Sequence, residues 1–90
     1  MITVEVHDRM EAMRIIGELK DFAIKNDIDA DVDMSRVAIT VHIDKGVRGI
    51  ASYRDVDGRK IVGLDFVITT QHIGSIAVIR RMMRMAEVMQ

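Results

Sequence analysis

Four aspartates that alternate with apolar residues in the segment DIDADVDM are the first candidates for chemistry. They are Asp27, Asp29, Asp31 and Asp33. The spacing Asp27-x-Asp29-x-Asp31 is that of the start of an EF-hand calcium loop, which also requires a glycine at its sixth position and a glutamate at its twelfth. Val32 and Ala38 stand at those two positions. The sequence therefore predicts no calcium site.

The same aspartates are better explained as one face of a strand. Alternate residues of a strand lie about 6.6–6.8 Å apart on one face, so their carboxylates form a row and do not converge on an ion. Such a row protects an edge strand from pairing with other chains. The alternative is an acidic ridge that contacts a basic partner or imitates a phosphate backbone. We expect the edge strand and keep the partner ridge as the alternative.

Two histidines and a glutamate are the candidates for catalysis or metal binding. Glu5, His7 and His42 fall on the predicted polar side of the sheet, where imidazole and carboxylate groups could hold a metal or exchange protons. The histidines have no metal-ligand spacing, and no motif places a substrate beside them. The glycines do not form a phosphate-binding loop. We therefore expect no enzymatic activity, no metal and no cofactor.

The last residues of the chain, IRRMMRMAEVMQ, predict a helix with two different sides, because apolar residues and arginines each recur at helical spacing. At 100° per residue the apolar side chains of this helix cover an arc of about 180°, whereas packing on a sheet needs a stripe of about 100°. The surplus predicts an apolar interface, for which methionine is well suited. The predicted interface residues are Ile79, Met82, Met83, Met85, Ala86 and Met89. The alternative is that the first helix covers the whole arc.

Three arginines on the same helix support a rival prediction. Arg80, Arg81 and Arg84 occupy the remaining arc, where they could contact the phosphates of a nucleic acid. Against this, no aromatic residue is interleaved for base stacking, and the net charge of the chain is −1. Arginine near the C-terminal end of a helix also complements the helix dipole. Nucleic-acid binding is therefore the second functional prediction.

Alternation and turn residues define the elements that must position these side chains. Ile2, Val4 and Val6 predict a strand, and Asp8 with Glu11 forms a capping box at the start of a helix over 9–26. Further strands are predicted over 27–34, 37–43, 47–54 and 60–68, with a hairpin turn at Asp57-Gly58. A last helix is predicted over 71–89, capped by Thr69 or Thr70. The order β-α-β-β-β-β-α predicts an α+β fold, a mostly antiparallel sheet with both helices packed on one face.

Length and charge complete the expectations. Ninety residues predict one domain, 1–90, and the chain has no cysteine. Residues 1–45 hold six Lys/Arg and ten Asp/Glu, a net −4, whereas residues 46–90 hold seven and four, a net +3. Such segregated charge favours oriented association. No signal peptide and no apolar run of roughly 20 residues is present. We expect a cytoplasmic regulator or inhibitor that binds protein, as a homodimer or with another partner, and no membrane.

Overall fold

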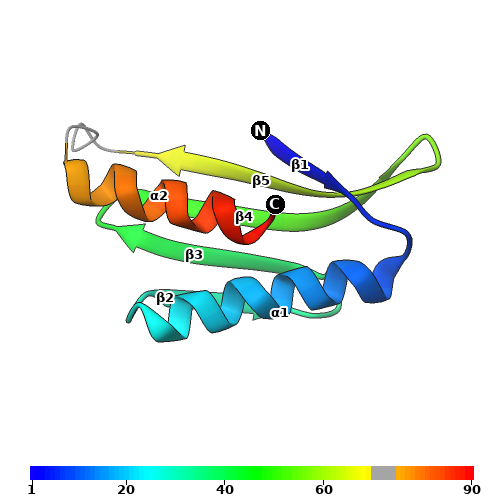
Figure 1. Cartoon of the computed structure of the whole chain (residues 1–90), viewed down its shortest axis with the longest axis horizontal. Helices are drawn as coiled ribbons and strands as arrows, with labels where there is room; N and C mark the ends of the chain where they lie inside the picture. The colour runs from blue at the N-terminus through cyan, green and yellow to red at the C-terminus, as the bar shows by residue number, and fades with distance from the viewer. Residues whose placement is uncertain (70–74) are drawn as a thin grey trace.

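The structure, a computed structural model, describes residues 1–69 and 75–90. The elements are β1 (Ile2–Glu5), α1 (Arg9–Lys25), β2 (Asp29–Asp33), β3 (Ala38–Asp44), β4 (Val47–Val56), β5 (Arg59–Ile68) and α2 (Ile76–Val88). The strands form one sheet in the order β1-β5-β4-β3-β2, and every neighbouring pair is antiparallel. Both helices lie on the same face of this sheet (Figure 1). The predicted α+β fold and order of elements are therefore confirmed.

The first helix begins where the capping residues predict. The Asp8 carboxylate accepts a hydrogen bond from the Glu11 N–H at 2.8 Å, and the Glu11 carboxylate accepts one from the His7 N–H at 3.0 Å. The first bond satisfies a backbone donor that the first turn of the helix leaves without an intrahelical partner, and the second holds the residue that precedes the cap. The helix then buries one apolar face against the sheet. Its buried residues are Ala12, Ile15, Ile16, Leu19 and Ala23.

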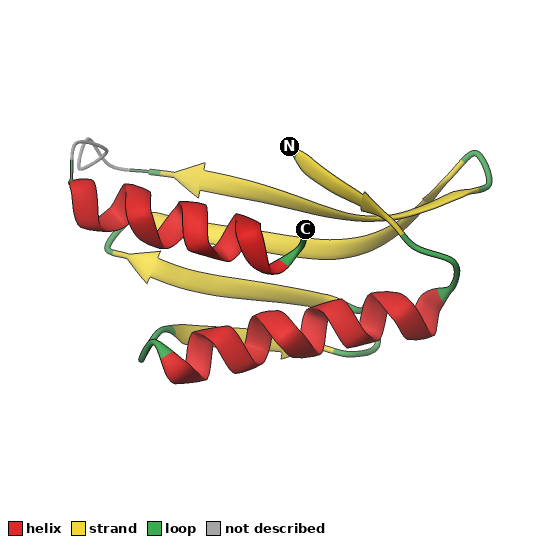
Figure 2. Ribbon diagram, in the orientation of Figure 1, coloured by secondary structure: helices red, strands yellow, loops and turns green. Residues whose placement is uncertain are grey.

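The β4–β5 hairpin turns at the predicted dipeptide. Asp57 has φ 54° and Gly58 has φ 83°, so both residues are in the left-handed region that a two-residue hairpin turn of type I′ requires. Val56 pairs with Arg59 directly beside the turn. The other connections between neighbouring strands are also short loops (Figure 2). These short loops place β2, β3, β4 and β5 side by side in chain order. The first strand, β1, instead pairs with β5.

The core lies between the helices and the helix-facing side of the sheet, and it is built from aliphatic residues and methionine. Ile39, Val41, Ala51, Val62 and Leu64 supply most of its floor, and each is at most 1% exposed. The two phenylalanines and the tyrosine are only partly buried at its border. The opposite face of the sheet carries the polar residues and is not covered by a helix (Figure 1).

Two local predictions differ from the structure. Thr69 is not a helix cap; its backbone N–H and hydroxyl both donate to the carbonyl oxygen of Gly46, at 2.7 and 3.1 Å, which extends the β4–β5 pairing. The N-cap of α2 is Ser75, which makes no side-chain capping bond. Thr70 and residues 71–74 of the predicted helix lie outside the described residues. Val37 precedes β3 in a left-handed conformation, with φ 52°, instead of starting the strand.

Candidate functional site

The apolar arc of α2 is divided between the core and the surface. Val78, Met85 and Met89 are 2%, 0% and 4% exposed, because they face the sheet and α1. Ile76, Ile79 and Met83 are 67%, 44% and 60% exposed. We call these three residues the α2 stripe. Their spacing of three and four residues places them along one side of the helix.

Two of the predicted interface residues therefore belong to the core. Met85 and Met89 are buried within this chain, so neither side chain is available to a partner, and their assignment to the interface was wrong. Met82 and Ala86 are half-buried at the boundary between the core and the surface. The part of the apolar arc assigned to the interface was too wide. Both α1 and the sheet contact α2, so more of the helix circumference is buried than a sheet alone would cover.

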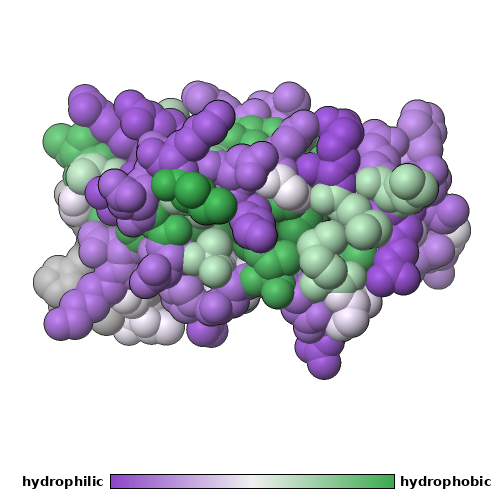
Figure 3. Space-filling view, turned by 90° about the horizontal axis from the view of Figure 1, so that it is seen from below, coloured by the Kyte–Doolittle hydropathy of each residue, from purple (hydrophilic) through white to green (hydrophobic). Residues whose placement is uncertain are grey.

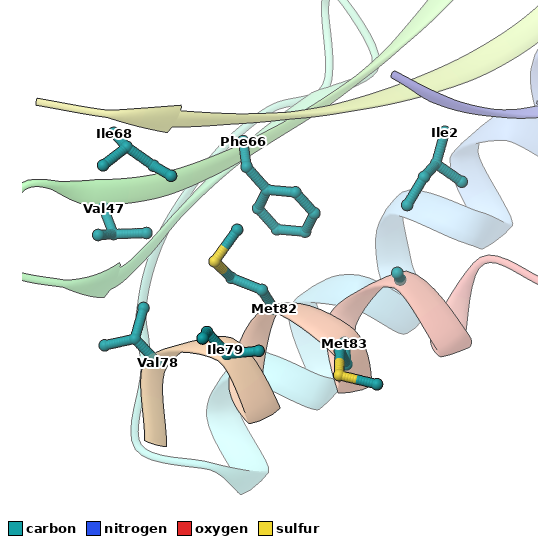
Figure 4. Close-up of a pocket in the computed structure, with 9 residues that line it drawn as sticks. Ile2, Val47, Phe66, Ile68, Val78, Ile79, Met82 and Met83 are labelled. Carbon is teal, nitrogen blue, oxygen red and sulfur yellow. The ribbon is translucent and has the colours of Figure 1, made fainter. Parts of the chain in front are cut away.

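An apolar cavity of about 260 Å³ lies beside α2 and opens to solvent. Its walls are the side chains Ile79, Met82, Met83 and Ala86 from the helix, Ile2 from β1, and Phe66 and Ile68 from β5, with Val47 and Val78 at its base. Figure 4 shows Ile2, Phe66 and Met82 directed into this space. We call this cavity the α2 groove. It is larger than the roughly 150 Å³ that holds a benzene molecule in an apolar protein cavity.

The groove exists because the helices are displaced toward one side of the sheet. Met85 packs on Gly49 of β4, and the Arg81 guanidinium donates to the Ile43 carbonyl oxygen of β3 at 3.1 Å. These contacts hold α2 over β3 and β4, while β1 and the outer part of β5 extend beyond it (Figure 1). Sequence reasoning missed Ile2, Phe66 and Ile68 because it treated them only as strand residues. The available signal was that two helices must cover five strands unevenly.

The three arginines of α2 do not act as one group. Arg81 is tied to β3 by its bond to Ile43. Arg80 and Arg84 are exposed, and neither has a hydrogen bond or ion pair within the described part of the chain. Among the described residues, this helix therefore offers two cations to an external partner, where the sequence suggested three.

The row of aspartates lies on an edge strand, as predicted. Asp29, Asp31 and Asp33 lie exposed on β2, the outermost strand beside β3, whereas Asp27 sits in the turn after α1 with φ 53° and does not join the row. His42 Nε2 lies 3.1 Å from Asp31 Oδ2. A hydrogen bond from the Ser35 hydroxyl lowers the pKa of Asp33. Two of the three carboxylates are therefore already engaged within the chain.

The residues considered for catalysis are not assembled into one site. Glu5 is on β1 and His42 is on β3, with β5 and β4 between them, so their strands are about 14 Å apart. His7 lies between β1 and α1, and Glu5 is instead paired with Arg59. Within residues 1–69 and 75–90, no group of three or more His, Cys, Asp or Glu side chains could hold a metal ion.

The α1 side of the molecule has a different surface. Viewed from this side, its apolar patches are interrupted by hydrophilic side chains (Figure 3). Met10 and Ile24 are 77% and 63% exposed, but they lie at opposite ends of α1. Neither lines the α2 groove. Exposed apolar side chains thus adjoin an apolar cavity at α2, whereas those of α1 do not line it.

In comparisons with known proteins, this chain matches no family model, no curated protein and no solved structure. Among the described residues, neither helix is both long and apolar enough to span a membrane.

Proposed function

We propose that this chain is a non-enzymatic protein-binding module, a small regulator or inhibitor that self-associates through α2. The observation that carries the proposal is the apolar groove open to solvent beside the exposed α2 stripe. Contiguous exposed apolar surface of this kind marks a protein interaction site in soluble proteins. Methionine and phenylalanine, which line the groove, are enriched at protein interfaces.

The composition of the groove supports a macromolecular partner and gives no basis for a polar substrate. Among the residues that the structure describes, those lining the groove are all apolar: Ile2, Val47, Phe66, Ile68, Val78, Ile79, Met82, Met83 and Ala86. A site for a small polar ligand normally adds a few convergent polar groups that fix its orientation. Here two charged residues, Arg80 and Glu87, lie on the exposed side of the helix next to the stripe, which is the arrangement of a polar rim around an apolar centre.

The proposal is tested by the solution mass of the protein, measured by light scattering coupled to size exclusion at low and high salt. We expect an oligomer that resists high salt, because apolar contacts are not screened by ions. The double variant Ile79→Glu/Met83→Glu should be a folded monomer with unchanged circular dichroism. The matched control Met10→Glu/Ile24→Glu, with the same change at exposed apolar positions of α1, should keep the wild-type mass. A wild-type monomer at every concentration contradicts the proposal.

Nucleic-acid binding is the second candidate, supported by the exposure of Arg80 and Arg84. It is weakened by the engagement of Arg81 with Ile43 and by the acidic row on β2, which repels phosphates. The test is an electrophoretic shift with mixed DNA and RNA at about 50 mM salt, where phosphate contacts are strong. A shift that disappears in Arg80→Ala/Arg84→Ala would support this candidate. No shift of the wild-type protein would eliminate it.

A further inference from the structure

We infer that two copies of this chain associate by antiparallel pairing of α2 about a two-fold axis beside Met83, with Arg80 of each copy opposite Glu87 of the partner subunit. This inference rests on the proposed function, because it gives the geometry of that self-association. It follows from three features of one short helix: a protruding apolar stripe, an adjoining apolar groove, and two opposite charges separated by two turns.

The stripe and the groove are the two complementary halves of an interface. In a two-fold interface the same surface meets itself, so every contact occurs twice. Ile79 and Met83 protrude from α2 and also form one wall of the groove. When a second α2 lies beside the first, the stripe of each copy reaches the groove of the other. The pairing would cover the part of the sheet that the helices leave open, around Phe66 and Ile68.

The charges beside the stripe select the antiparallel direction. Arg80 and Glu87 are both exposed and seven residues apart, so they lie on the same side of the helix two turns from each other. Opposing Arg80 to Glu87 of the partner subunit places the two-fold axis between Met83 and Arg84, within the exposed part of the helix. A parallel pair would instead place Arg80 against Arg80 of the partner subunit. Like charges in contact across an interface are unfavourable.

Arg84 does not select between the two directions. It is four residues after Arg80 and three before Glu87, so it lies on the same side of the helix as these charges, and the two-fold axis passes beside it. In either direction Arg84 therefore lies close to Arg84 of the partner subunit. Arg81 points further from the stripe and is bonded to Ile43. The charged groups beside the proposed contact are therefore Arg80, Arg84 and Glu87 of each copy, and only the antiparallel direction brings opposite charges together.

A charge-reversal experiment tests the register. Arg80→Glu and Glu87→Arg should each raise the dimer dissociation constant, by between about twofold and thirtyfold, because two exposed ion pairs are lost per dimer. The double variant Arg80→Glu/Glu87→Arg restores both pairs and should return to within about twofold of wild type. Lys20→Glu is the control, with the same reversal of charge at an exposed position of α1, and it should have little effect. Failure of the double variant to recover would overturn the inferred register.

Single cysteines test the direction, since the chain has no cysteine of its own. Met83→Cys should form a disulfide across the two-fold axis under mild oxidation. Ile76→Cys should not, because the two copies of residue 76 would be about 22 Å apart along the helices, far beyond the roughly 7 Å that a disulfide can join. Cross-linking of both variants would mean a parallel pair and would overturn this inference while leaving the proposed function intact. A wild-type protein that never dimerises would overturn both.

Discussion

The Sδ atom of Met85 lies 2.9 Å from the position that a Cβ atom on Gly49 would occupy, and its Cε atom lies 3.0 Å from the same position. A buried methionine of α2 thus fills the space that a side chain on β4 would need. Gly49 lies in the strand, and its missing side chain allows the helix to approach the sheet this closely. The contact fixes Met85 in the core and leaves Met83, two residues earlier, at the surface.

Replacing Gly49 with alanine should therefore destabilise the protein. The added methyl group forces the buried Met85 side chain to move, and overpacking of this kind typically costs about 1–3 kcal/mol in the free energy of unfolding. The Phe66 ring, 3.3 Å from the same position, limits the space into which Met85 can move. The measurement is urea denaturation followed by circular dichroism. Gly17→Ala is the matched control, because apart from its chain neighbours and the nearby backbone of α1 no atom lies within 4 Å of the position that its methyl group would occupy. It should stabilise the helix by about 0.5–1 kcal/mol.

The methionines of α2 should separate into two energetic classes. Met85→Ala removes a fully buried side chain and should cost about 2–5 kcal/mol of stability. Met83→Ala, at a position 60% exposed, should change the stability of the monomer by less than about 0.5 kcal/mol. Denaturation at concentrations below the dimer dissociation constant makes the comparison. Equal losses for the two variants would contradict the assignment of Met83 to the surface.

Removal of the cap of α1 should have a measurable and local effect. Asp8→Ala eliminates the acceptor of the Glu11 N–H and should cost about 0.5–2 kcal/mol of stability. Asp8→Asn should retain most of the wild-type stability, because its side-chain oxygen can accept the same hydrogen bond. Thermal unfolding of the two variants distinguishes a capping role from a charge effect. Equal destabilisation by both changes would argue that the charge, and not the hydrogen bond, is responsible.

The pH dependence of stability should include a contribution from Asp33. The Ser35 hydroxyl bond lowers the pKa of this carboxyl, so folding favours its ionised form. The resulting stabilisation is fully present at pH values above the pKa that Asp33 has in the unfolded chain. It decreases as the pH falls below about 4 and is lost as the pH passes through the pKa of Asp33 in the folded protein. Ser35→Ala should raise the pKa of Asp33 toward its ordinary value and reduce this loss. NMR titration of the Asp33 carboxyl measures the shift, and Ser52→Ala, on β4, should leave it unchanged.

Much of the fold follows from local sequence patterns that agree with one another. The alternation of Ala30 and Val32 with aspartates predicts β2, and the Asp57-Gly58 dipeptide predicts the hairpin, because each depends only on neighbouring residues. Thr69 shows where this reasoning fails. Its residue type suits a helix cap, but its position opposite Gly46 allows it to continue the β4–β5 pairing. That alternative depends on a residue 23 positions earlier in the sequence.

The candidate site was only partly predictable for the same reason. Helical periodicity identified the apolar arc of α2, including Ile79 and Met83, but it cannot give the position of the helix on the sheet. That position depends on the contact between Met85 and Gly49 and on the bond from Arg81 to Ile43. Once these contacts are known, Met85 and Met89 move into the core. Phe66, from a different part of the chain, becomes part of the groove.

The order of the strands also has a consequence for how the chain reaches its folded state. Ile2 of β1 pairs with Leu64 of β5, so the first strand needs a partner that lies 62 residues later in the sequence. The four-strand meander from β2 to β5 can assemble through short connections, whereas closing β1 onto it requires a large loop. Folding slows as the average separation between contacting residues grows. On a ribosome, β1 therefore waits until nearly three quarters of this sequence has been made before its place in the sheet exists.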